Sequence, residues 1–177
     1  MRKDFRLAGT GGQGVISLAM IMANAYGIYE GKEVTQTQSY GAEARGGACQ
    51  AALIVSDEKI GYMKVDDADI FIVFSIAAYK KYIDAIRPGA IVFADSTFIP
   101  SEETDKLKDC TVYTIPATDI ATKEFKPFTA NIVMLGFVAA KLDDLSLESC
   151  EAVIMQEMAP KHIPMNLAAV KAGYERG

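Results

Sequence analysis

The stretch "GTGGQG", residues 9–14, constrains the fold of this sequence more than any other part of it. A short apolar run at residues 5–8 comes before it, and a long apolar run at residues 15–29 follows it. The first run predicts a strand, and the alanine, leucine and methionine content of the second predicts a helix. Glycines at the junction permit a tight turn from strand to helix. The unit begins a pattern of alternating strands and helices.

The same turn is a candidate anion site. Three glycines fit the spacing G-x-G-x-x-G, in which the backbone can approach a phosphate closely and the helix N-terminus presents free N–H groups. The alternative is a glycine-rich turn that only packs tightly. The candidate binding residues here are Gly9, Thr10, Gly11, Gly12, Gln13 and Gly14.

The residues around the turn argue against two common nucleotide sites. An NAD-binding fold of this kind has an acidic residue at the end of its second strand, for the ribose hydroxyls. Here the second strand lies around Val34 and ends in polar, uncharged residues 35–38, whereas Glu33 stands at its start. A Walker A loop is excluded, because no Gly-Lys-Ser/Thr follows the glycines. An NAD-linked dehydrogenase is therefore disfavoured.

Further strands and helices alternate along the chain. Residues 48–63 predict a strand, a tight turn at residues 56–58 and a short return strand, which together make a hairpin. Other strands are expected at 68–75, 90–96 and 110–118, and helices at 77–89, 129–141, 147–158 and 164–174. The pattern predicts one domain over residues 1–177, with a mostly parallel, Rossmann-like α/β sheet, an early hairpin and helices on both faces.

Composition narrows the class of protein. A net charge of -5 argues against nucleic acid as a partner, because phosphates call for a basic face. The N-terminal residues lack the apolar segment of a secretory signal, and no apolar run reaches the roughly 18 residues of a membrane span. We expect a cytoplasmic protein without a membrane partner.

The metal-ligating residue types are sparse. Cys49, Cys110 and Cys150 stand far apart without a CxxC pair, and the single histidine, His162, has no cysteine near it. Iron–sulfur clusters and structural zinc need closely spaced thiolates, so we expect no metal held by this chain alone. The cysteines are interpreted as reduced, apolar thiols, and no catalytic residue is assigned.

A second loop, "SYGAEARGG" at residues 39–47, carries several candidate binding residues. Arg45 offers a planar fork of donors for a phosphate or carboxylate, and Tyr40 offers a flat face and a hydroxyl. The alternative is a solvated loop with a local pair of Glu43 and Arg45. Because the loop follows the second strand, we expect it near the glycine turn. The candidates are Ser39, Tyr40, Gly41, Glu43, Arg45, Gly46 and Gly47.

Four segments together resemble one family. They are "GTGGQGV" at 9–15, "TQSYGAEARGG" at 37–47, "ANIVMLG" at 130–136 and "NLAAVKAGY" at 166–174. They are similar to the gamma subunit of 2-oxoacid:ferredoxin oxidoreductases, and the likeness spans nearly the whole chain. Ala42 departs from the pattern, because many members have proline there, and it leaves the loop backbone freer.

The resemblance implies a complex that oxidatively decarboxylates a 2-oxo acid, passes electrons to ferredoxin and gives the acyl group to coenzyme A. It implies alpha and beta subunits as partners, with or without a delta subunit, which carry the thiamine diphosphate and the iron–sulfur clusters. For this chain it implies a role in assembly and in binding coenzyme A. Asn131 matches the family's Ala-Asn pair and would bond the glycine loop or a partner, or be satisfied locally.

Several alternatives remain at this level. The chain could instead be a freestanding nucleotide- or coenzyme A-binding module. The helix expected at 15–29 is so apolar that a partner, or a second copy of the isolated chain, would cover its outer side. Ser75 and Asp95 end strands and would face a ligand or cap the next helix. The sequence does not distinguish pyruvate, 2-oxoglutarate, branched-chain 2-oxo acids and indolepyruvate as the substrate.

Overall fold

The structure is a computed structural model that describes residues 1–40 and 47–177. Within these residues, six strands form one sheet in the order β2-β3-β1-β4-β5-β6. β3 runs antiparallel to β1 and β2. The pairs β1–β4, β4–β5 and β5–β6 are parallel. The predicted fold class is confirmed. The strands are β1 (Arg2–Thr10), β2 (Glu33–Tyr40), β3 (Ala48–Ser56), β4 (Ala68–Val73), β5 (Ile86–Asp95) and β6 (Thr111–Ile115).

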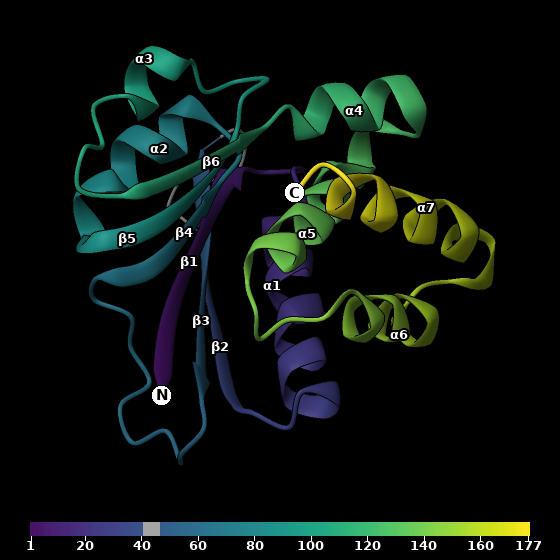
Figure 1. Ribbon diagram of the computed structural model, residues 1–177, viewed down its shortest axis with the longest axis horizontal. Coiled ribbons are helices and arrows are strands. Elements are labelled where there is room, and N and C mark those ends of the chain that lie inside the picture. The colour runs from purple at the N-terminus through teal and green to yellow at the C-terminus, as the bar shows by residue number, and fades with distance from the viewer. Residues whose placement is uncertain (41–46) are drawn as a thin grey trace.

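Helices cover both faces of the sheet (Figure 1). On one side α1 (Val15–Asn24) and α5 (Ala130–Lys141) lie nearer the sheet, and α6 (Leu147–Glu157) and α7 (Ile163–Tyr174) lie outside them. The other side carries α2 (Ile76–Tyr82) and α3 (Ser101–Thr104), and α4 (Ala117–Glu124) packs against α5. Short turns of 3-10 or π type lie at Ala25–Tyr29, Ile83–Ala85, Pro127–Thr129 and Pro160–His162.

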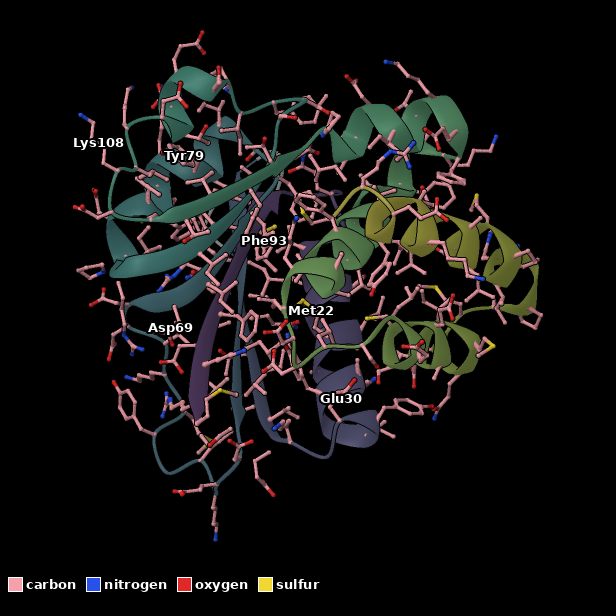
Figure 2. All side chains as sticks on the ribbon, in the orientation of Figure 1. Met22, Glu30, Asp69, Tyr79, Phe93 and Lys108 are labelled. Carbon is pink, nitrogen blue, oxygen red and sulfur yellow. The ribbon has the colours of Figure 1, made fainter. Side chains whose placement is uncertain are left out.

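Each face of the sheet buries its own apolar core. Figure 2 shows Met22 of α1 and Phe93 of β5 between the sheet and the larger helical layer, where both are fully buried. The ring of Phe93 meets that of Phe137 edge-on, with centroids 6.1 Å apart. On the opposite face Tyr79 of α2 is buried, and its hydroxyl donates to the carbonyl of Glu103 at 2.9 Å. These two cores hold the strand ends in fixed positions.

The hairpin predicted at residues 48–63 is absent, and the antiparallel pair of consecutive strands is β2 with β3, earlier in the chain. β3 pairs with β2 on one edge and with β1 on the other, so it has no edge left for a return strand. The expected return strand after Ser56 is therefore wrong, and residues 57–67 form no strand. Instead, Arg2 and Arg6 of β1 donate to backbone carbonyls of this segment and hold it against the sheet.

The predicted helix at 77–89 also ends early. α2 stops at Tyr82, and β5 begins at Ile86, which pairs with Ala68 of β4. Pro88 and Gly89, which the sequence predicts to stop the helix, lie within β5 instead, and the N–H of Gly89 donates to the carbonyl of Asp109 at 2.8 Å. The helices predicted at 129–141, 147–158 and 164–174 are confirmed within about a residue at each end.

The apolar helix after the glycine turn is buried on two sides, as predicted. α1 packs against β3 on one side and against α5 and α6 on others. Its outer side exposes Ser17 and Met20, and the π-helical turn that follows it exposes Ile28. The isolated chain thus leaves one apolar stripe of this element open to solvent.

Candidate functional site

The glycine turn lies at the carboxyl edge of the sheet, where the parallel strands end. In the register, Gly9 is opposite Cys49 of β3, and Cys49 is opposite Tyr40 of β2. Both ends of the β2–β3 connection therefore lie beside the turn, as the order of elements predicts. Ser39, near the end of β2, is exposed, and Gly47, just before β3, is half-buried. Four candidate residues lie outside the described residues, namely Gly41, Glu43, Arg45 and Gly46.

Gln13 holds the turn in shape. Its Oε1 accepts from the backbone N–H of Thr10 at 2.7 Å, and its Nε2 donates to the carbonyl of Phe74 at 3.1 Å. The second bond ties the turn to the chain just after β4. A Cβ at Gly9 would lie 2.8 Å from Oε1 of Gln13, which is closer than side-chain packing allows. Gln13 therefore holds the turn in place through its hydrogen bonds, and Gly9 leaves the space that the Gln13 side chain occupies.

Gly14 joins the turn to α5. It has a φ of 74°, in the left-handed region that favours glycine. Its carbonyl accepts from Nδ2 of Asn131 at 3.2 Å, and a Cβ at Gly14 would lie 2.5 Å from that nitrogen. The hydrogen bond from Asn131 to the glycine loop, one of the predicted alternatives, is thus present. Asn131 is 6% exposed, and its Oδ1 has no partner among the described residues.

Gly11 and Gly12 differ from the other two glycines, because a Cβ on either would meet open space. Gly12 has a φ of 93°, so only its backbone requires glycine, whereas packing places no demand on Gly11. The first turn of α1 holds no acidic residue, and Gly14 supplies no side-chain cap. Among the described residues, no side chain caps the N–H groups at this helix start, which is the arrangement that a phosphate site needs.

Two hollows open on either side of the turn. One of about 270 Å³ is lined by Ile16, Ser17 and Cys49 together with the glycines. The other, of about 450 Å³, has Phe98 and Phe128 on its walls and Gly11, Gly12 and Gln13 beside them. The sequence did not mark these two phenylalanines, because single aromatic residues in connecting segments form no pattern. Ligand-sized pockets are roughly 300–1,000 Å³, so the larger hollow is the better candidate.

Other polar residues at the strand ends have structural roles. The Ser75 hydroxyl caps α2 by accepting from the N–H of Ala78 at 3.2 Å. Asp95 is fully buried, and its carboxylate accepts from the N–H of Thr97 at 3.0 Å and from the hydroxyl of Thr118 at 2.6 Å. These bonds fix the segment after β5 and the start of α4. Ser75 therefore caps the next helix, as one alternative predicts, whereas Asp95 does not cap α3, the helix that follows it.

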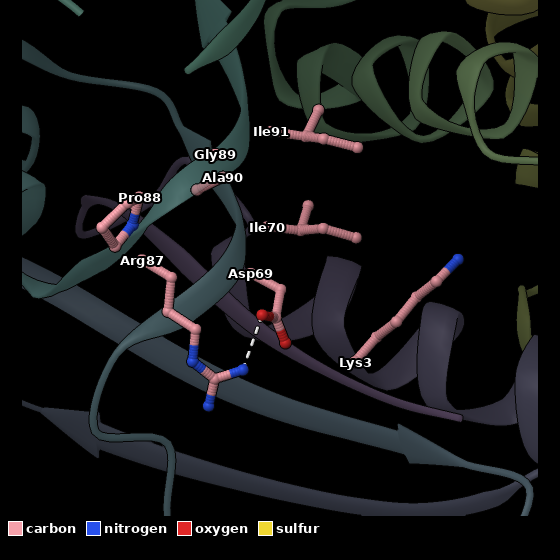
Figure 3. Close-up of a pocket in the computed structure, with 8 residues that line it drawn as sticks. All are labelled: Lys3, Asp69, Ile70, Arg87, Pro88, Gly89, Ala90 and Ile91. Carbon is pink, nitrogen blue, oxygen red and sulfur yellow. Dashed lines mark hydrogen bonds and ion pairs between the residues drawn. The ribbon is translucent and has the colours of Figure 1, made fainter. Parts of the chain in front are cut away.

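A further hollow lies at the opposite, amino edge of the sheet. Figure 3 shows Arg87 and Asp69 directed toward one another, with Lys3 on the far side. The guanidinium of Arg87 lies 2.6 Å from a carboxylate oxygen of Asp69, and the ammonium of Lys3 lies 2.8 Å from one of Asp144. Because each cation already has a carboxylate partner, this hollow is the weaker candidate for an anionic ligand.

The cysteines behave as apolar side chains. Burial raises the pKa of the Cys49 thiol, which keeps it protonated beside the turn, and it raises the pKa of Cys150 to about 12. In residues 1–40 and 47–177, no three His, Cys, Asp or Glu side chains gather in a way that could hold a metal ion. The donor set found there does not fit an iron–sulfur cluster. None of the helices in the same residues is long and apolar enough to cross a bilayer.

Comparisons with known proteins converge on one group. The family model described as pyruvate ferredoxin/flavodoxin oxidoreductase matches residues 4–176. A curated relative, the 2-oxoglutarate synthase subunit KorC of Methanocaldococcus jannaschii, is 43% identical over 99% of this chain and 94% of its own length. The gamma subunit of a keto/oxoacid ferredoxin oxidoreductase from Geobacter sulfurreducens has a TM-score of 0.86 at 29% identity, covering 99% of this chain and 95% of that one.

A longer solved chain is also similar. It belongs to a 2-oxoglutarate:ferredoxin oxidoreductase from Magnetococcus marinus with 2-oxoglutarate, coenzyme A and succinyl-CoA bound. The match has a TM-score of 0.86 at 26% sequence identity, and covers 99% of the present chain but 31% of the longer one. There, the fold described above is one part of a larger polypeptide.

Proposed function

Because this chain belongs to the pyruvate ferredoxin/flavodoxin oxidoreductase family, as the gamma subunit of a 2-oxoacid:ferredoxin oxidoreductase, we propose that it binds coenzyme A phosphate groups at its glycine turn. The observation that carries this is the start of α1, which no described side chain caps, beside Gly11 and Gly12, where an added Cβ would meet no atom of the described residues. Backbone N–H groups and the helix dipole favour an anion there. Arg45, whose fork of donors suits a phosphate or a carboxylate, would add positive charge there.

We further propose 2-oxoglutarate as the 2-oxo acid. The support is the 43% identity to a 2-oxoglutarate synthase subunit over nearly the whole of both chains. In the reaction, 2-oxoglutarate loses CO₂, its acyl group passes to the thiol of coenzyme A as succinyl-CoA, and two electrons pass to ferredoxin. Thiamine diphosphate and iron–sulfur clusters of partner subunits would supply the decarboxylation and electron transfer. This chain would contribute binding and assembly.

Gly11→Ala tests the phosphate site. A methyl group there meets no atom of residues 1–40 and 47–177, so the variant should fold and assemble normally. It would stand where a phosphate approaches the backbone, and we expect the apparent KM for coenzyme A to rise about tenfold. Gly61→Ala is the matched control, since a Cβ at Gly61 also meets open space, away from the turn. An unchanged KM in the Gly11→Ala complex would refute the site.

Copurification tests the assembly role. Native purification of the tagged chain from its own cells should recover subunits that carry thiamine diphosphate and iron–sulfur clusters. The part-for-whole match to a longer chain favours such partners, as does the open stripe of Met20 and Ile28. Recovery of the chain alone, as a monomer or a pair of copies, would favour a freestanding coenzyme A-binding module instead.

A further inference from the structure

We propose that the hollow between Phe98 and Phe128 receives the adenine base of coenzyme A. This inference rests on the proposed phosphate site, since the same hollow contains Gly11 and Gly12 of the turn. A ligand with phosphates at the turn could extend its nucleoside directly between the two rings. The hollow's volume of about 450 Å³ is in the range of pockets that hold small molecules.

Both rings are exposed to solvent. Phe98 is 47% exposed and Phe128 is 60% exposed, whereas Phe5, Phe71, Phe74 and Phe93 are fully buried. The rings come from two segments far apart in the sequence, one after β5 and one in the turn before α5. Exposed aromatic rings that line one hollow offer flat faces on which a base can stack. The aromatic faces are the feature that selects a planar ligand.

Both rings stand on braced backbone. The N–H of Phe98 donates to the carbonyl of Asp95, whose side chain in turn bonds the segment to Thr118 of α4. Phe128 lies between Pro127, which fixes its own φ, and Thr129, whose hydroxyl donates to the carbonyl of Lys126 at 2.8 Å. The ring of Phe128 also meets the edge of His162, with centroids 6.4 Å apart. Pre-positioned rings lose little entropy when a ligand binds.

The walls of the hollow favour stacking over hydrogen-bond recognition of the base. Gln13 already uses both ends of its amide within the chain, and the Thr118 hydroxyl donates to Asp95. The site should therefore tolerate changes at the edge of a purine. Coenzyme A with an etheno-adenine ring, which is fluorescent and keeps the flat face, should bind as well as coenzyme A itself.

The test compares two acyl acceptors in the assembled complex. 4′-Phosphopantetheine carries the reactive thiol and one phosphate but no adenosine. Phe98→Leu and Phe128→Leu should raise the apparent KM for coenzyme A about tenfold, because stacking on an aromatic ring is lost. Both leucine variants should leave the KM for 4′-phosphopantetheine unchanged. The Phe128→Tyr variant keeps an aromatic face, so its KM for coenzyme A should equal that of the wild type. Tyr174→Leu, an exposed ring outside the hollow, is the matched control.

A direct measurement does not depend on the variants. Etheno-coenzyme A should lose fluorescence when it binds the wild-type complex, since stacking quenches the ring. Undiminished fluorescence on binding would overturn the proposal, as would equal KM changes for both acceptors or no change for coenzyme A. If Gly11→Ala weakens coenzyme A binding and the leucine variants do not, only the base site fails. If the leucine variants are selective and Gly11→Ala is silent, the phosphate placement fails instead.

Discussion

Asn131, at the start of α5, donates its side-chain amide to the carbonyl of Gly14, at the start of α1, across 117 residues of sequence. The bond links the start of the helix after the glycine turn to the start of the most deeply buried helix of the chain. The position of the turn therefore depends on α5 as well as on β1. Two of the four segments that resemble the family meet in this one contact.

Replacing Asn131 should destabilise the chain in a graded way. Asn131→Ala removes the bond, and we expect the free energy of unfolding to fall by about 1–2 kcal/mol. Asn131→Asp turns the donor into an acceptor that faces the Gly14 carbonyl in a buried site, so it should cost more than alanine. Urea denaturation at pH 7 measures both. Asn24 is a half-buried asparagine of α1, and the control variant Asn24→Ala should change the free energy of unfolding little. If Asn131→Asp is as stable as Asn131→Ala, the hydrogen bond to Gly14 does not contribute as proposed.

The crossing of α5 and α7 gives a second stability prediction. A Cβ at Gly136 would overlap the backbone carbonyl of Val170, and one at Gly173 would overlap that of Val133. Because these obstacles are backbone atoms, they cannot move aside as a flexible side chain would. Gly136→Ala and Gly173→Ala should each lower the free energy of unfolding by about 3 kcal/mol or more. Thermal unfolding measures this, with Gly61→Ala as the control; a loss below about 0.5 kcal/mol would show that the helices can separate.

These contacts show what the sequence predicts and what it leaves out. The strand at residues 5–8, the glycine turn and the helix after it were predictable, because each has its own local pattern. The return strand after Ser56 was not correctly predicted. The local turn residues there do suggest a hairpin, but pairing depends on which edges other strands occupy, and β1 and β2 take both edges of β3.

The site shows the same division. The order of elements correctly predicted that both ends of the β2–β3 connection lie beside the glycine turn, and the family likeness marked Asn131. By contrast, the sequence does not show which of the four glycines in the turn could carry a side chain, because that depends in part on residues distant in the sequence. A Cβ at Gly14 would meet Asn131, whereas one at Gly11 would meet none of the described residues. Phe98 and Phe128 lie 30 residues apart and gain a shared role only through the fold.

The buried thiol of Cys150 should be chemically silent in the folded chain. Burial raises its pKa to about 12, so almost none of it is thiolate at pH 8. We expect a disulfide reagent at pH 8 to label Cys49 and Cys110, which are partly exposed, well before Cys150. Mass spectrometry of digested protein assigns the labels. Rapid labelling of Cys150 without denaturant, at the rate seen in urea, would show that α6 opens readily.

Glu30 should make stability depend on acid pH. Burial alone would raise its pKa, but hydrogen bonds from Ser149 and Ser146, at the start of α6, lower the pKa below its ordinary value. A carboxylate whose folded pKa is lowered stabilises the fold above its unfolded pKa of about 4.3, and this stabilisation is lost as pH falls through the folded value. The helix dipole of α6 favours the same ionised form.

Glu30→Gln should therefore cost roughly 1 kcal/mol of unfolding free energy at pH 7, and the difference from wild type should shrink as pH falls below about 4. Urea denaturation at several pH values measures the trend. Glu33→Gln makes the same change three residues on, at the exposed start of β2, and is the matched control. If the two variants differ from wild type by equal amounts at every pH, the bonds to α6 do not hold Glu30 in its ionised form.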